Sequence, residues 1–176
     1  MTRTSQKISA WQYDRGVMMK KKNYAAYGSN TYAPQMQRRC PEAKLVGTAF
    51  LKDYELEFRG AATVVPKPGA QVPVVLWEIT ELNEERLDVC EGVPHGVYHK
   101  ETVTVELDGK PFTGMLYVKN GGSTFPPKEG YAKRMLLGYQ QHGLDVKFIH
   151  DALDRAYLAQ ADQDEDLSEA PDITQE

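Results

Sequence analysis

Residues 27–30, with the sequence YGSN, have the types and order expected of a ligand-binding turn. Gly28 and Asn30 both tolerate the positive φ angles of turns, and a glycine also lets a ligand approach the backbone closely. The turn could present successive N–H groups to an anion, and a helix starting near Thr31 would add its positive end. A plain turn with a capping residue explains the same four residues, so the pattern alone leaves both interpretations open.

Glu91 is a second candidate because it stands at the expected C-terminus of a short helix. Thr80 opens this helix, Glu81 and Glu84 occupy a first turn that favours acids, and Gly92 ends it. At the C-terminal end the helix dipole disfavours a charged carboxylate, and partial burial would raise its pKa further. Such a group can serve as general base and then as general acid. Taken alone, however, a solvated carboxylate at a helix end is the simpler interpretation.

The histidines and cysteines form no pattern typical of a metal site or a nucleophile. His95 and His99 are four residues apart, but His95 falls in an expected loop and no H-E-x-x-H pattern is present. Cys40 and Cys90 form no C-x-x-C pair and are expected to be reduced thiols of a cytoplasmic protein. Ser29 is not part of a G-x-S-x-G sequence. We therefore expect neither a metal nor a thiol or serine nucleophile.

Charge is distributed unevenly along the 176 residues, whose net charge is −4. We expect a basic, disordered extension at 1–22, one domain at 23–160, and an acidic, disordered tail at 161–176. The lysine run at 20–22 lacks interleaved aromatic residues, so no nucleic-acid binding is expected. No apolar run is long enough for a membrane helix or a secretory signal. The sequence does not determine the oligomeric state.

The central part of the chain predicts an α+β domain of short strands and helices. Asp108-Gly109 is typical of a hairpin turn, between strands 102–107 and 113–118. Further strands are expected at 24–27, within 43–60, and at 72–79, the last being apolar enough for burial on both faces. Pro66, Pro68 and Gly69 indicate a loop, and helices are expected at 31–40, 80–91, 131–143 and from 145 onward. Together these elements predict a small, mostly antiparallel β-barrel or curled sheet with inserted and appended helices.

Several segments, in this order, resemble the γ-glutamylcyclotransferase family, which includes AIG2-like and γ-glutamylamine cyclotransferase proteins. The resembling segments are YGSN (27–30), RRCPEAKLVGTAFLKDYELEFRG (38–60), ATVVPKPGAQVPVVLWEIT (62–80), LDVCEGVPHGVY (87–98), YVKN (117–120) and PPKEGYAKRMLLGYQQHGLD (126–145). The resemblance covers roughly residues 24–155. The sequence departs from the family at Thr31, where leucine is frequent, and at Val89 and Cys90, where other members vary.

The resemblance implies a compact barrel-like α+β fold and an enzyme that cleaves a γ-glutamyl amide. The α-amine of the substrate attacks its own γ-amide carbonyl, releasing pyroglutamate and a free amino acid or amine, with no metal or organic cofactor. Glu91 matches the catalytic acid/base of the family. The residues that match its substrate-binding positions are Tyr27, Gly28, Ser29, Asn30, Tyr98 and Tyr131.

Two other functions are compatible with the sequence. A module of the same fold could bind γ-glutamyl compounds without turning them over, or the acidic tail could bind a partner. The leaving group is also open, because γ-glutamyl amino acids, γ-glutamylamines and a γ-glutamylated carrier present the same reacting end. Glutathione is disfavoured, because the family branch specialised for it has different motifs.

Overall fold

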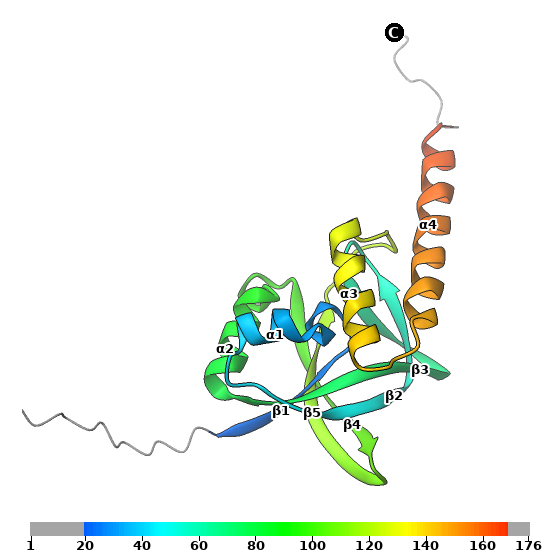
Figure 1. Cartoon of the computed structure of the whole chain (residues 1–176). Coiled ribbons are helices and arrows are strands. Elements are labelled where there is room, and N and C mark those ends of the chain that lie inside the picture. Colours follow the sequence, from blue (N-terminus) through cyan, green and yellow to red (C-terminus); the bar gives the residue numbers. More distant parts are fainter. Residues whose placement is uncertain (1–19, 169–176) are drawn as a thin grey trace, which may run out of the picture.

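The computed structural model describes residues 20–168 (Figure 1). Its strands are β1 (Lys21–Ala26), β2 (Lys44–Phe58), β3 (Ala62–Thr80), β4 (Tyr98–Leu107) and β5 (Lys110–Lys119). Its α-helices are α1 (Ala33–Arg39), α2 (Glu81–Cys90), α3 (Glu129–Gln141) and α4 (Lys147–Ser168), and short 3-10 helices occupy Ser29–Thr31 and Val93–His95. Within the described residues no helix is both long and apolar enough to cross a membrane.

The five strands form one mixed, strongly curled sheet in the order β2-β3-β1-β5-β4. Neighbouring strands are antiparallel except for β1 and β5, which run parallel with Tyr24 opposite Met115. The two end strands approach each other through side chains, since the Tyr54 hydroxyl of β2 lies 3.5 Å from Glu101 Oε2 of β4. The described strands contain no ladder between β2 and β4, so the curl stops short of a closed barrel. This confirms the α+β prediction of a curled sheet with added helices.

Apolar side chains fill the inside of the curl and the space below the helices. The inner core includes Phe58, Leu76 and Tyr139, and a second cluster centred on Met36 and Leu87 lies under α1 and α2. In Figure 1, α1, α2 and α3 lie on the same side of the sheet, and α4 runs away from its edge. The helices therefore cover the end of β1 and the YGSN residues, which follow directly after it.

Several local predictions are confirmed. Asp108 and Gly109 form the hairpin turn with φ angles of 50° and 74°. Residues 72–79 are almost completely buried within β3. The Thr80 side chain caps α2 by accepting a hydrogen bond from the Asn83 backbone N–H, and the Asn83 side chain accepts one from Thr80 N–H in return.

Two predictions of local structure are wrong. Pro66, Pro68 and Gly69 do not form a loop but belong to β3, where the pairing with β2 shifts register opposite Asp53. Prolines are tolerated there because Pro66 has a ladder partner on one side only and Pro68, within the register shift at 67–70, has a partner on neither side. Thr31 does not cap α1, since Tyr32 occupies that position and the Thr31 hydroxyl donates to Gly28 O at 2.8 Å.

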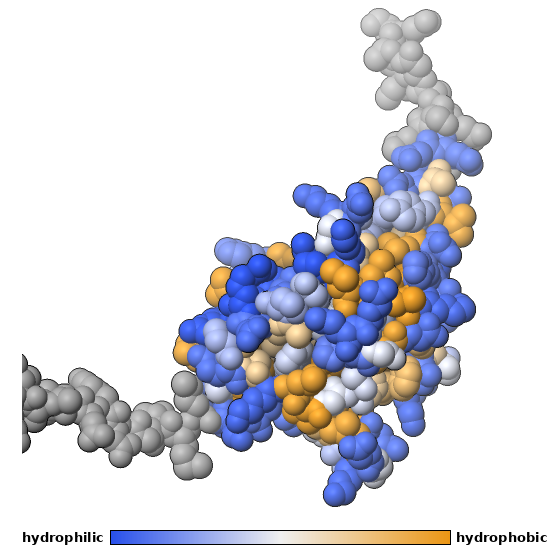
Figure 2. Space-filling view, in the orientation of Figure 1, coloured by the Kyte–Doolittle hydropathy of each residue, from blue (hydrophilic) through white to orange (hydrophobic). Residues whose placement is uncertain are grey.

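The expected boundaries of the two tails also need correction. β1 begins at Lys21, so the sheet starts inside the expected 1–22 extension. α4 continues to Ser168, so the first half of the expected disordered tail is helical. The early turns of α4 bury Ile149, Ala152 and Ala156, and because helix formation is cooperative the packed part propagates into the polar part. Figure 2 shows that the far end of α4 is largely hydrophilic. Residues 1–19 and 169–176 lie outside the described residues.

Candidate active site

The end of β1 and the end of α2 meet at a small cavity of about 20 Å³. The structure brings all seven of the sequence-predicted site residues to this inner cavity, although they are spread from position 27 to position 131. The lining residues are Tyr24, Tyr27, Gly28, Ser29, Asn30, Ala62, Glu91, Tyr98, Tyr117 and Tyr131. The lining residues come from several elements, among them β1, the 3-10 helix after it, the C-terminus of α2, β4, β5 and α3.

Gly28 is needed for close packing rather than for a positive φ angle. Its φ is −97°, and Asn30 is likewise absent from the described residues with positive φ. A Cβ atom at position 28 would lie 3.2 Å from the Tyr131 hydroxyl and 3.5 Å from the Ala62 Cβ. The glycine therefore lets Tyr131 of α3 reach the loop. The expectation of a positive-φ turn is wrong, and the group that approaches the backbone of Gly28 in this structure is the Tyr131 hydroxyl.

Glu91 is the C-cap residue of α2, and its side chain is only 18% exposed. Its Oε1 accepts hydrogen bonds from Asn30 Nδ2 at 3.1 Å and from Arg39 Nη1 at 2.9 Å. Burial raises the pKa of the Glu91 carboxyl, while the Arg39 charge and the two hydrogen bonds oppose that rise. The carboxyl group therefore has a raised pKa but also partners that keep its ionised form accessible.

Two residues of α1 hold the YGSN loop against Glu91, and sequence reasoning missed both as site residues. Gln35 Nε2 donates to Ser29 Oγ at 2.8 Å and to Asn30 Oδ1 at 3.0 Å. Arg39 Nη1 donates to Asn30 Oδ1 at 2.8 Å in addition to its contact with Glu91. The i, i+4 spacing of Gln35 and Arg39, which places them on one helix face, is the sequence signal that could have identified them.

The same network determines the orientation of the Asn30 side chain. Its Oδ1 accepts from Gln35 and Arg39, so its Nδ2 is left to donate to Glu91 Oε1 and, at 2.9 Å, to the Tyr24 hydroxyl. Tyr24 was also missed by sequence reasoning. Because each polar atom of Asn30 has two partners, the amide is held rigidly beside the carboxylate.

The tyrosines of the cavity remain protonated. Burial raises the pKa of Tyr27, Tyr98 and Tyr131 above the ordinary tyrosine value. Tyr98 donates to Ala62 O at 2.8 Å, and Tyr27 donates to the backbone oxygen of Tyr117, so both hydroxyl protons are engaged by backbone carbonyls. Tyr131 instead accepts from the Ala62 N–H at 3.2 Å, and its hydroxyl also interacts with Ser29 of the YGSN loop.

A wider cavity of about 310 Å³, which we call the vestibule, adjoins the inner cavity. The two cavities share Ser29, Glu91, Tyr98 and Tyr131. The vestibule is completed by Arg39, Ala61, Val89, Cys90, Gly92, Val97 and Lys119. Glu91 thus lines both spaces, and the two family departures before it, Val89 and Cys90, belong to the vestibule wall.

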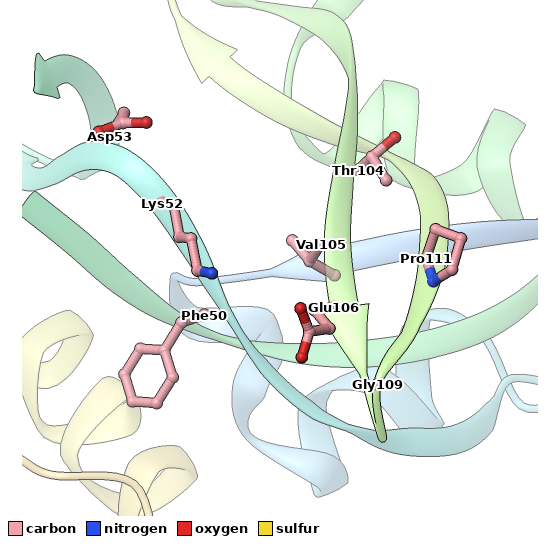
Figure 3. Close-up of a pocket in the computed structure, with 8 residues that line it drawn as sticks. All are labelled: Phe50, Lys52, Asp53, Thr104, Val105, Glu106, Gly109 and Pro111. Carbon is pink, nitrogen blue, oxygen red and sulfur yellow. The ribbon is translucent and has the colours of Figure 1, made fainter. Parts of the chain in front are cut away.

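A separate cavity of about 430 Å³ lies between β2 and the β4–β5 hairpin (Figure 3). Lys52 and Glu106 extend toward it from opposite strands, whereas the Phe50 ring turns away. These side chains are exposed, and none of the predicted site residues lines this cavity. Since it lacks a buried titratable group, it is not a candidate for acid–base chemistry.

Neither a metal centre nor a reactive thiol is indicated in the described part of the chain. No group of three or more His, Cys, Asp or Glu side chains in residues 20–168 could hold a metal ion. Burial raises the pKa of the Cys40 thiol to about 11, so this residue is not a thiolate at neutral pH. Among the residues that line the inner cavity, Glu91 is the one with a carboxyl group.

Known proteins similar to this chain in sequence and in structure point to the same family. Residues 71–152 match the model of the AIG2-like family. The chain is 32% identical to a γ-glutamylcyclotransferase of Bos taurus over 138 residues, covering 71% of this chain and 73% of the relative. The corresponding protein of Homo sapiens is 31% identical with the same coverage. A solved structure of a γ-glutamyl cyclotransferase has a TM-score of 0.70 and 28% identity, covering 76% of this chain and 86% of that chain.

Proposed function

This chain belongs to the γ-glutamylcyclotransferase family, and we propose that it cleaves γ-glutamyl amides by intramolecular aminolysis. The α-amine nitrogen of the glutamyl group attacks the γ-carbonyl carbon, and the bond from that carbon to the amide nitrogen breaks. The products are the five-membered lactam pyroglutamate and a free amino acid or amine.

We assign both proton transfers to Glu91. The attacking amine must lose a proton, and the departing nitrogen must gain one because it leaves poorly as an anion. A single carboxyl group can take the first proton and deliver the second. Both side chains that bind Glu91 within the described residues donate to Oε1, which leaves Oε2 to exchange the proton.

The observation that carries this proposal is the environment of the Glu91 carboxyl group. Its burial raises the pKa toward the range in which a group can act as acid and base near neutral pH. The contacts with Arg39 and Asn30 keep the carboxylate form populated and hold it in one position. A solvated glutamate at a helix end would have neither property.

The inner cavity is the proposed binding site for the glutamyl part of the substrate. The Ser29 and Tyr131 hydroxyls provide polar groups for its carboxylate or for the oxyanion that develops during attack. The Asn30 amide, whose hydrogens go to Glu91 and Tyr24, instead holds the Glu91 carboxyl group in place. The cavity has room for about one water-sized group, so binding requires some lining side chains to rotate. The leaving group then extends into the vestibule, past Glu91.

Pyroglutamate release from γ-glutamyl amino acids and γ-glutamylamines tests this proposal. We expect the wild-type protein to release pyroglutamate and Glu91→Gln, which retains the shape but not the proton, to lose at least about a hundredfold in kcat. Glu81→Gln is the matched control, because Glu81 lies exposed in the first turn of the same helix. Full activity of Glu91→Gln would refute the assigned mechanism. Ligand-dependent thermal stabilisation without any product would instead support a binding module.

A further inference from the structure

Lys119 is the charged group of the vestibule that the proposed mechanism does not use. The charged residues of the vestibule lining are Arg39, Glu91 and Lys119. Arg39 and Glu91 neutralise each other through their 2.9 Å ion pair. No ion pair of Lys119 is found among the described residues, so the vestibule has one uncompensated positive charge.

The backbone and side chain of Lys119 are both held in place. Lys119 is the last residue of β5 and lies opposite Tyr98 in the β4–β5 ladder. Its backbone N–H donates to Thr63 Oγ1 at 3.1 Å, and its Nζ lies 5.3 Å from the centre of the Tyr98 ring. The ammonium group is therefore positioned by a cation–π contact on a residue that lines both the inner cavity and the vestibule.

The leaving groups of γ-glutamyl amides differ in charge close to the bond that breaks. In a γ-glutamyl amino acid, a carboxylate carbon lies two bonds from the departing nitrogen. In a γ-glutamyl monoamine this charge is missing, and in a γ-glutamyl diamine the far end is positive. A fixed cation attracts the carboxylate of a departing amino acid, has no charge to act on in a monoamine and repels the positive end of a diamine. The remaining wall of the vestibule, with Val89 and Val97, suits an apolar side chain.

We infer that Lys119 is a specificity-determining residue that selects leaving groups with a carboxylate, so that γ-glutamyl amino acids are preferred over γ-glutamylamines. This inference rests on the proposed function and on the assignment of the vestibule to the leaving group. Lys119 acts by pairing with the carboxylate of the departing amino acid, not by taking part in proton transfer.

γ-Glutamylalanine and γ-glutamylethylamide form a matched pair of probes, because they differ only by the carboxylate of the leaving group. We expect Lys119→Met to lower kcat/KM for γ-glutamylalanine about tenfold, the size of one lost charge-assisted contact, and to leave γ-glutamylethylamide nearly unchanged. Lys119→Glu should lower kcat/KM for γ-glutamylalanine further and raise kcat/KM for the γ-glutamyl amide of 1,4-diaminobutane. Lys52→Met is the control, because it removes one positive charge from an exposed residue that lines the separate cavity between β2 and the β4–β5 hairpin (Figure 3).

The outcomes separate this inference from the proposed function. Release from both probes with a ratio unchanged by Lys119→Met would overturn the inference alone. An equal loss of kcat/KM on both probes would also overturn the inference alone, since it would mean that Lys119 contacts the glutamyl part of the substrate or serves only in packing. No release of pyroglutamate by the wild-type protein from either probe would overturn the proposed function and this inference with it. A ratio that changes in Lys119→Met and not in Lys52→Met supports the inference.

Discussion

Replacing Arg39 by methionine should raise the pKa of Glu91 and move the pH dependence of activity. The ion pair joins Arg39 Nη1 to Glu91 Oε1 at 2.9 Å, with side chains 24% and 18% exposed. At this distance Coulomb's law gives about 1.4 kcal/mol at the dielectric constant of water and about 6 kcal/mol at an effective value of 20. Because both groups retain contact with solvent, a value near the lower bound applies, which corresponds to about one to two pKa units.

The sign of the effect follows from the role of Glu91 as base. The carboxylate form is needed for attack, so kcat/KM falls as the pH decreases through the pKa of Glu91. Burial already raises this pKa, and removing Arg39 takes away the largest opposing influence. The acidic limb of the profile should therefore move to higher pH by about one to two units, with activity at pH 7 reduced and partly recovered at higher pH.

The assay is kcat/KM for pyroglutamate release between pH 4 and pH 9, with Arg38→Met as the matched control. Arg38 is the preceding residue in the last turn of α1 and is exposed, so its replacement removes the same charge without touching Glu91. A limb that stays in place or moves to lower pH in Arg39→Met would refute the role of Arg39. The same shift in both variants would show that the overall charge of α1, rather than the ion pair, is responsible.

The remaining predictions concern stability. Gly138→Ala would place a Cβ 2.2 Å from Thr31 Oγ1 and 2.7 Å from Tyr32 N. We therefore expect urea denaturation to show that the free energy of unfolding falls by about 3 kcal/mol. Gly130→Ala is the control and should leave this free energy unchanged, because the nearest atom to its Cβ would be 4.0 Å away. An equal loss in the two variants would contradict the close packing of α3 on the YGSN loop. Burial raises the pKa of Glu84, but hydrogen bonds from Lys100 and Lys22 outweigh it and lower the pKa overall. A carboxyl group whose pKa is lowered by folding stabilises the protein at pH values above its unfolded-state pKa. Glu84→Gln should therefore cost about 1 kcal/mol at pH 7 and progressively less as the pH falls below about 4. Glu85→Gln, which removes the same charge at an exposed position, is the control.

Local sequence patterns were sufficient for many of the elements. The Asp108-Gly109 hairpin depends on residues that tolerate positive φ, and the start of α2 depends on a cap formed between Thr80 and Asn83. Both are interactions between residues close in the chain, so the pattern contains the cause. The Pro66 to Gly69 region was predicted wrongly because a proline's effect depends on which neighbours the strand has, and only the sheet order decides that.

The residues of the candidate site likewise fall into those that the sequence indicated and those that depend on the fold. Glu91 and the YGSN loop were identified from the sequence because their residue types, order and family resemblance are visible in the chain itself. The roles of Arg39, Gln35 and Lys119 could not be predicted, because each depends on a partner brought near by the curl of the sheet and the packing of α1.

The order of residues along the chain specifies which groups are available for chemistry: a carboxyl group at a helix end, a glycine-containing loop and two tyrosines. The protonation and orientation of those groups depend on the folded protein, because burial, ion pairing and hydrogen-bond geometry involve residues far apart in the chain. The pKa of Glu91 is raised by the protein packed around it and moderated by Arg39, which lies 52 positions earlier. Burial and charge therefore turn an ordinary glutamate into a candidate acid and base.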